Sequence, residues 1–299
     1  MGETVGLFLV GLNDYQERLK EDAVKRAKHL GFDIDVQVAD NDAGRQLTQI
    51  KTAIDRRAST GMMAMLVCPV SDNALAAAGR AAVVAGLDWI LLNRSADYLD
   101  PLRDEFPGQI VFTVLPDQNE IGRIQGQQVR ALVDPGLRVL CVTGRADTWS
   151  ARLRLAGLKA AVADANPIAD IDGGWTTEGA RRAVDNWLDT EASRETIGAF
   201  VAQNDDMALG TRQAIRDALT RHQLPLDAVP ILGCDGSPRF GQRLVRERRI
   251  ACTVAVSSAA GPALDWLRRA RSGEERPPTQ VLLPVTSFPA IEELSRPAG

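Results

Sequence analysis

Short apolar runs alternate with amphipathic segments along almost the whole chain. Ten runs have strand length, and several carry apolar residues at consecutive positions, as in MMAMLVCPV (62–70). Consecutive apolar positions are typical of strands in a parallel sheet, because helices cover both of its faces. The runs lie at 4–12, 32–40, 62–70, 88–94, 110–116, 138–144, 168–175, 197–204, 229–235 and 250–256.

Most of the intervening segments have helical periodicity, for example ERLKEDAVKRAKHL (17–30) and DMALGTRQAIRDAL (206–219). Alternating strands and helices predict βαβ units and parallel sheets. The stretch 95–109, rich in Asp, Pro and Gly, breaks this rhythm, and a second set of units begins after residue 116. The pattern therefore predicts an α/β protein with two doubly wound, Rossmann-like domains.

The composition removes several classes of function. The chain has 299 residues and a net charge of -4, which gives no basic field for nucleic acid. No apolar run reaches the length of a membrane span. The four cysteines form neither a CxxC pair nor a zinc-ligand spacing, so we expect buried free thiols and no metal or cofactor.

The residues that end the apolar runs are the candidates for ligand contact, because open α/β sheets bind ligands outside the carboxyl ends of their strands. Amides, carboxylates, arginine and flat aromatics suit a polyhydroxylated neutral ligand. No glycine-rich phosphate loop, nucleophile elbow or metal cluster is visible, so we expect no enzyme. The strand-end residues are Asn13, Tyr15, Cys68, Asn93, Arg94, Asp117, Trp149, Trp175, Asn204, Asp235, Val256 and Ser257.

Six segments occur in an order that resembles the type I periplasmic binding protein superfamily, which includes ribose-binding-like sugar receptors and lactose-repressor-like effector domains. The most specific are QNDDMALG (203–210), GCDG (233–236) and SARLRLAG (150–157). The others are LLNR (91–94), LPDQNEIGRIQG (115–126) and ACTVAV (251–256). The resemblance covers essentially the whole chain.

The resemblance implies two α/β lobes joined by three crossing segments, with the ligand in the cleft between the lobes. We expect crossings near 116–118, 255–258 and 278–285. The domains would then be discontinuous, with residues 1–116 and 257–280 in the N-terminal lobe. Residues 117–256 and 281–299 would form the C-terminal lobe.

The same resemblance implies roles for particular residues. Asn204 and Asp235 would hydrogen-bond sugar hydroxyls, Arg154 would reach ring or hydroxyl oxygens, and Arg152 would face solvent. Trp175 would pack on the sugar, with Trp149 as a second platform, although core or hinge packing remains an alternative for both. Tyr15 would replace family aromatics in a loop one residue shorter. The expected ligand-binding residues are Asn13, Tyr15, Asn93, Arg94, Trp149, Arg154, Trp175, Asn204 and Asp235.

Two acidic residues are expected to cap helices. Asp205 would cap the helix that follows Asn204, and an alternative in which residues 204–206 serve only as caps stays open. Asp117 begins a D-x-x-E pattern typical of a helix start, which predicts a capping and hinge role.

Three positions depart from ribose receptors, which carry Gln, Asn and Asp where this chain has Val256, Cys68 and Asn93. The first two changes remove hydrogen-bonding capacity, and the third removes a negative charge. We therefore expect a ligand other than ribose, such as a deoxy or substituted sugar, a polyol or a sugar with an anionic group.

The function that the resemblance implies is that of a solute receptor for an ABC importer. The partners would be a monosaccharide or sugar derivative and the membrane permease of the transporter, and the receptor would be a periplasmic monomer. If the protein is secreted, we expect its signal peptide to have been removed from this sequence. Two alternatives remain: a periplasmic sensing domain, and the effector domain of a transcription regulator truncated before its helix-turn-helix.

Overall fold

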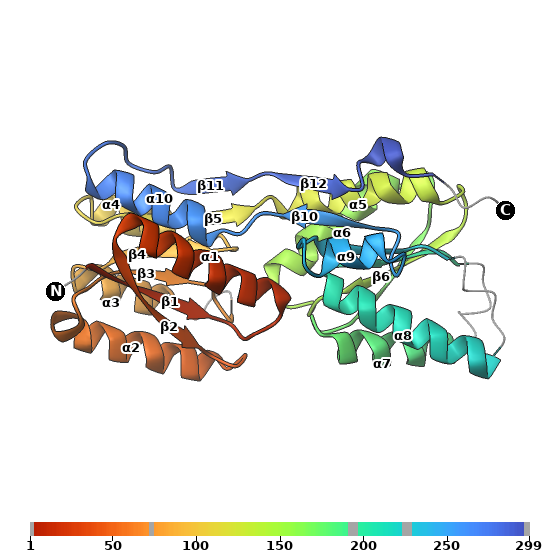
Figure 1. The fold of residues 1–299 in the computed structure, drawn as a ribbon, viewed down its shortest axis with the longest axis horizontal. Helices are drawn as coiled ribbons and strands as arrows, with labels where there is room; N and C mark the ends of the chain where they lie inside the picture. Colours follow the sequence, from red (N-terminus) through yellow and green to blue (C-terminus); the bar gives the residue numbers. More distant parts are fainter. Residues whose placement is uncertain (1–2, 72–74, 191–196, 223–228, 296–299) are drawn as a thin grey trace. The chain divides into compact units, whose positions relative to one another are not determined.

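The computed structural model describes residues 3–71, 75–190, 197–222 and 229–295, with side chains of residues 220–222 left out. It divides into two compact units (Figure 1). Unit 1 comprises residues 1–116 and 258–283, and unit 2 comprises residues 117–257 and 284–299. The chain therefore passes from one unit to the other three times. The sequence-based boundaries, after residues 116, 256 and 280, compare with 116, 257 and 283 here.

Unit 1 is a six-stranded sheet with the strand order β11-β5-β4-β3-β1-β2, and every neighbouring pair is parallel. Its strands are β1 (Glu3–Leu9), β2 (Phe32–Val38), β3 (Met62–Val67), β4 (Asp88–Leu92), β5 (Val111–Pro116) and β11 (Gln280–Leu283). Its helices are α1 (Asp14–Leu30), α2 (Ala43–Thr60), α3 (Ala76–Val84), α4 (Leu99–Glu105) and α10 (Ala260–Arg271).

Unit 2 repeats this arrangement with the strand order β12-β10-β9-β8-β6-β7, in which only the edge strand β12 runs antiparallel. Its strands are β6 (Arg138–Thr143), β7 (Ile168–Asp172), β8 (Ile197–Ala202), β9 (Ile231–Asp235), β10 (Cys252–Val256) and β12 (Val285–Phe288). Its helices are α5 (Gln118–Leu132), α6 (Trp149–Val162), α7 (Thr177–Leu188), α8 (Asp205–His222) and α9 (Gly241–Arg246), with a short 3-10 turn at Ile291–Glu293.

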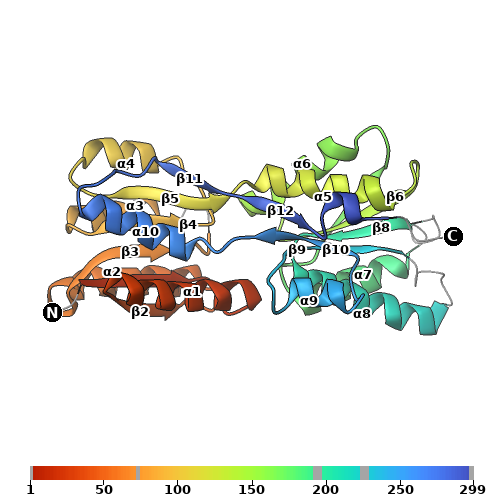
Figure 2. The same ribbon diagram turned by 45° about the horizontal axis from the view of Figure 1, so that its top comes forward.

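Each sheet separates two apolar layers, which explains the consecutive apolar positions of its strands. In unit 1, α1 and α10 cover one face, and α2, α3 and α4 cover the other. In unit 2, α5 and α6 cover one face, and α7, α8 and α9 cover the other (Figure 2). The predicted doubly wound parallel sheets are thus confirmed.

Two features differ from the sequence-based expectation. The stretch 95–109 contains the short helix α4, whose Leu99 and Leu102 are buried. The segment 278–285, expected only as a crossing, contains the edge strand β11 and the first residue of the edge strand β12, on either side of Pro284. Both strands are short and mostly exposed or half-buried, so their sequence lacks the apolar run that marks a central strand.

Helices α5 and α6 approach each other closely because glycine stands at the crossing. A Cβ added to Gly122 would lie 2.0 Å from the Arg154 carbonyl oxygen, and one added to Gly157 would lie 2.2 Å from that of Asn119. These contacts are with backbone atoms, which cannot move aside by changing rotamer. The two glycines thereby fix the position of the helix that carries Arg154.

The four cysteines, Cys68, Cys141, Cys234 and Cys252, are free and buried, as predicted. Burial raises the pKa of Cys141 and of Cys234 to about 12. Because the thiolate is the reactive form, we expect a chromogenic thiol reagent to label the native protein very slowly and all four thiols after denaturation. Rapid labelling of two or more thiols in the native protein would contradict this prediction.

Candidate functional site

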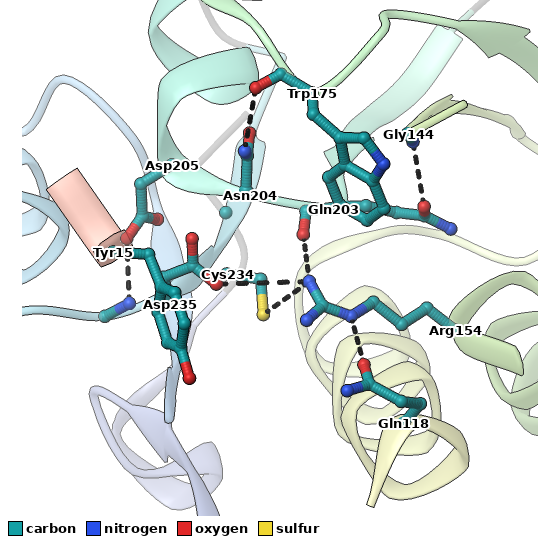
Figure 3. Close-up of polar contacts among 12 residues, drawn as sticks. Tyr15, Gln118, Gly144, Arg154, Trp175, Gln203, Asn204, Asp205, Cys234 and Asp235 are labelled. Carbon is teal, nitrogen blue, oxygen red and sulfur yellow. Dashed lines mark hydrogen bonds and ion pairs between the residues drawn. The ribbon is translucent and has the colours of Figure 1, made fainter. Parts of the chain in front are cut away.

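The candidate residues of unit 2 gather at the carboxyl ends of neighbouring strands. Asn204 follows β8, Asp235 ends β9, and Trp175 lies just after β7. Arg154 comes from the second turn of α6, the helix that follows β6. Figure 3 shows these four side chains around one region, which we call the Arg154 cluster. Strand order thus brings together residues that are up to 81 positions apart in the sequence.

The guanidinium group of Arg154 is the centre of this cluster, and the residue is only 7% exposed. Its Nε donates to Gln118 Oε1 at 2.7 Å, and its Nη1 donates to the carbonyl oxygen of Gln203. Nη1 also lies 3.4 Å from Cys234 Sγ and 4.0 Å from Asp235 Oδ1. The cluster thus combines one cation and one carboxylate, both largely removed from water.

The Trp175 ring lies against this cation, with 5.5 Å between the ring centroid and Arg154 Cζ (Figure 3). The ring also lies over Gly144, where an added Cβ would be 1.8 Å from a ring carbon. Gly144 N in turn donates to Gln203 Oε1 at 2.9 Å. A half-buried aromatic face beside a buried ion pair is a surface suited to the C–H face and hydroxyls of a sugar ring.

Three candidate residues have left-handed backbone conformations. The φ angles are 64° at Asn93, 66° at Trp175 and 96° at Asp235. Positive φ is uncommon for residues other than glycine and clusters at functional sites. The described chain has three other non-glycine residues of this kind, Asp40, Asn41 and Arg248. The positive φ angles of Asn93, Trp175 and Asp235 therefore occur at residues that the sequence had already identified as strand-end candidates for ligand contact.

The residue that caps helix α8 differs from the one that the sequence predicted. Asn204 is the residue that caps α8, because its Oδ1 accepts from Met207 N at 2.8 Å. Its Nδ2 donates to the Trp175 carbonyl oxygen at 3.2 Å. The prediction that Asp205 caps this helix was wrong: its carboxyl oxygens accept from Thr253 Oγ1 on β10 and from Gly236 N, just after β9. The capping role predicted for Asp117 is confirmed by its bond from Glu120 N.

The candidate residues of unit 1 form a second, smaller group. Tyr15 donates its hydroxyl to Asn93 Oδ1 at 2.5 Å. Asn93 Nδ2 lies 3.7 Å from Cys68 Sγ, and Gln16 Nε2 lies 3.4 Å from the same sulfur. Asn13 is exposed and caps α1 through a bond from Gln16 N at 3.0 Å.

Arg94 and Trp149, the two remaining candidates, lie outside both groups of contacts described above. Arg94 is half-buried after β4, and its carbonyl oxygen accepts from Thr113 Oγ1 at 2.6 Å. Trp149 is the half-buried first residue of α6. For these two, as for the other seven candidate residues, ligand contact stays a prediction.

Sequence reasoning missed the residues that orient Arg154. Gln203 is fully buried, and Gln118 is 2% exposed. Gln203 ends an apolar run, which is a usable signal for a buried polar residue. Gln118 follows the cap Asp117, and nothing in its spacing indicates that it turns toward a helix 36 positions later.

Replacing Gly144 with alanine is expected to displace the Trp175 ring, because the new Cβ would overlap it. We expect a loss of about 1–3 kcal/mol in the free energy of unfolding and a change in near-ultraviolet circular dichroism. Gly108→Ala is the control, since an added Cβ there meets nothing within 4 Å. Equal stability and equal spectra of the two variants would contradict the role of Gly144.

Asp205 is expected to give the stability an acid-dependent component. Burial, and then the neighbouring Asp235, raise the pKa of its carboxyl group, and Asp206 adds to this. The bonds from Thr253 and Gly236 act in the opposite direction. The folded state therefore holds this proton to a higher pH than the unfolded chain, whose Asp pKa is about 4.

The wild-type protein should then lose stability relative to Asp205→Asn as pH rises from about 4 through the folded pKa. Urea unfolding of both proteins over that range measures the difference. A constant difference would show that the two hydrogen bonds offset the effect of burial on the pKa, and a shift in favour of the wild type with rising pH would show that they outweigh it.

Within the described residues, no group of histidine, cysteine or acidic side chains could hold a metal ion. Nor is any described helix long and apolar enough to cross a membrane.

Comparisons with known proteins agree with this fold. A family profile described as "Periplasmic binding protein domain" matches residues 6–261. The ribose import binding protein of Salmonella typhimurium is 28% identical over 260 residues, covering 85% of this chain and 79% of that protein. The xylitol-binding protein of Mycolicibacterium smegmatis is 23% identical, and the match covers 78% of this chain and 61% of that protein.

Solved structures show the same fold. A galactofuranose binding protein superposes with a TM-score of 0.81 at 21% identity, covering 97% of this chain and 98% of its own. A periplasmic solute binding protein from Actinobacillus succinogenes with bound D-allose gives 0.78 at 20% identity, covering 95% and 96%. With its two parallel-sheet units and a family match over residues 6–261, this chain belongs to the type I periplasmic binding proteins, in their ribose-binding-like branch.

Proposed function

We propose that this protein is the solute receptor of an ABC importer and that it captures a monosaccharide or sugar derivative. The observation that carries the proposal is the Arg154–Asp235 pair beside the Trp175 ring, at the carboxyl ends of a parallel sheet. Family membership and relatives named as import binding proteins support it. The receptor would be periplasmic, with the transporter's membrane permease as its partner.

The proposed mechanism is binding with no chemistry on the ligand. Residues of both units would contact one sugar, so that the ligand favours a closed state over an open one that the free protein also samples. Affinity would come from complete pairing of sugar hydroxyls, because an unpaired buried polar group is costly. Sugar turnover by the purified protein would contradict this proposal.

In unit 2, the ligand would find hydrogen-bonding groups on Arg154 and Asp235 and a flat face on Trp175. Asn204 already uses its amide for Met207 and Trp175, so its further capacity is one lone pair on Oδ1 and one N–H. The proposed contacts of unit 1 are Asn13, Tyr15, Asn93 and Arg94, and Trp149 would be a second aromatic platform.

The chemistry of unit 1 bears on ligand class. Asn93 is engaged at both ends of its amide, by Tyr15 and by Cys68, and a thiol is a weak hydrogen-bonding group. In unit 2, Val256, at the end of β10, offers no side-chain hydrogen bond. We therefore propose that the ligand presents fewer hydroxyls to these positions than ribose does, as a deoxy or substituted sugar or a polyol would.

Thermal unfolding of ligand-stripped protein against pentoses, hexoses, deoxy sugars, polyols and sugar acids tests this function. A ligand at a hundred times its Kd should stabilise the protein by about 2.7 kcal/mol, which raises the midpoint by a few degrees. A flat response across the panel from a well-folded protein would contradict a sugar receptor. A clear preference for ribose would contradict only the proposed ligand class.

The proposed oligomeric state is a monomer with no nucleic-acid partner. Size-exclusion chromatography with light scattering, with and without the best sugar of the panel, measures it. A stable dimer would instead fit the effector domain of a regulator.

A further inference from the structure

The carboxyl group of Asp205 links the end of β8 to the turn after β9 and to strand β10 of unit 2. Asp205 itself follows β8 and is 1% exposed. Its Oδ1 accepts from Thr253 Oγ1 on β10 at 2.7 Å, and its Oδ2 accepts from Gly236 N, just after β9, at 2.8 Å. One of its oxygens therefore has its partner on β10 and the other in the turn that follows β9.

The fold leaves a space that matches this carboxyl group. A Cβ added to Gly233 would lie 2.2 Å from Asp205 Oδ1, and one added to Gly241 would lie 1.9 Å from Oδ2. Any larger residue at these positions would collide with the carboxyl group. Two glycines, one within β9 and one at the start of α9, thus make room for a buried acid that the hydrophobic effect alone would not place there.

The turn that this carboxyl group holds is strained. Asp235 has a φ of 96° and Gly236 a φ of 52°. A non-glycine residue in such a conformation persists only when its surroundings enforce it. The bond from Gly236 N fixes the plane of the peptide that joins Asp235 to Gly236, and so fixes the direction of Asp235.

We propose that Asp205 is a positioning residue, which holds the Asp235–Gly236 turn so that the Asp235 carboxylate stands beside Arg154 in a ligand-competent geometry. It contacts no ligand itself. The proposal about the turn stands on the geometry of unit 2 alone, and its consequence for affinity rests on the proposed function.

The test compares four variants with the wild type: Asp205→Ala, Asp205→Asn, Asp206→Asn and Thr253→Val. NMR measures the amide resonance and hydrogen exchange of Gly236. Calorimetry measures the Kd for D-ribose, L-arabinose, D-allose and myo-inositol. Asp206→Asn is the matched control, because it removes a carboxyl group from the same helical turn. Thr253→Val removes the other hydrogen bond of Asp205 and reports a merely structural role.

In Asp205→Ala we expect Gly236 to lose exchange protection and its resonance to move, with affinity falling by about tenfold or more, the equivalent of one hydrogen-bonded charged contact. Asp205→Asn should restore most of the affinity, because its amide oxygen can accept from Gly236 N while its NH2 donates to Thr253. Thr253→Val should lower stability but leave the Gly236 signal in place and affinity within about twofold of the wild type.

An unchanged Gly236 signal in Asp205→Ala overturns the proposal, and so does an equal loss of affinity in Thr253→Val. If Asp205→Ala does not fold, Asp205→Asn decides, because a changed acceptor must move the Gly236 resonance while Asp206→Asn leaves it in place. If the wild type binds none of the four compounds, the proposed function fails for them, and the Gly236 signal still decides the positioning role.

Discussion

Replacing Arg154 with leucine is expected to destabilise unit 2 by about 3 kcal/mol, because the Asp235 carboxylate would remain buried without its cation. Gln118 Oε1 and the Gln203 carbonyl oxygen would also lose their donor. We expect sugar affinity to fall by roughly 10- to 150-fold, the range for hydrogen bonds to a charged group. Urea unfolding and calorimetric titration measure the two effects separately.

The control for this prediction is Arg152→Leu on the same helix. Arg152 is exposed, and its Nη1 donates to the Asp147 carbonyl oxygen at 3.0 Å. Its loss should change stability by less than about 0.5 kcal/mol and leave affinity unchanged. If both variants behave alike, Arg154 is not the centre of the site. A stability loss without a loss of affinity would leave Arg154 as a purely structural residue.

The second large effect is expected from Gly122→Ala. The new Cβ would lie 2.0 Å from the Arg154 carbonyl oxygen and 2.8 Å from Leu158 N, so α5 and α6 would have to separate. Overpacking against backbone costs about 1–3 kcal/mol or more, which exceeds the gain of about 1 kcal/mol from placing alanine in a helix. Separation of the helices would also shift Arg154, so affinity should fall together with stability.

Gly44→Ala is the helical control for this substitution. Gly44 lies in the first turn of α2, and a Cβ there would approach only the flexible Asp42 side chain, at 3.3 Å. This variant should be as stable as the wild type or more stable. A Gly122→Ala protein that is as stable as Gly44→Ala would show that the two helices can separate at little cost.

Local sequence patterns determined the fold class. All ten apolar runs became strands. The central strands are buried on both faces and carry consecutive apolar residues, whereas the edge strands β2 and β7 are half-buried and mix apolar with polar residues. The edge strands β11 and β12 escaped detection because each has only four residues and is mostly exposed or half-buried. The polar break after Ala202 marks a strand end, and the run-ending residues included Asn93, Asn204 and Asp235.

What the sequence could not determine was the partner of each polar side chain. Asp205 reads as a helix cap because Asp is common at that position, yet its carboxyl group bonds Thr253, 48 positions later. The contacts of Gln118 and Gln203 with Arg154 could not be predicted either, because these residues come from separate βα units that only the sheet order brings together. Local spacing specifies strands and helices, whereas long-range hydrogen bonds depend on strand order, which only the tertiary structure decided.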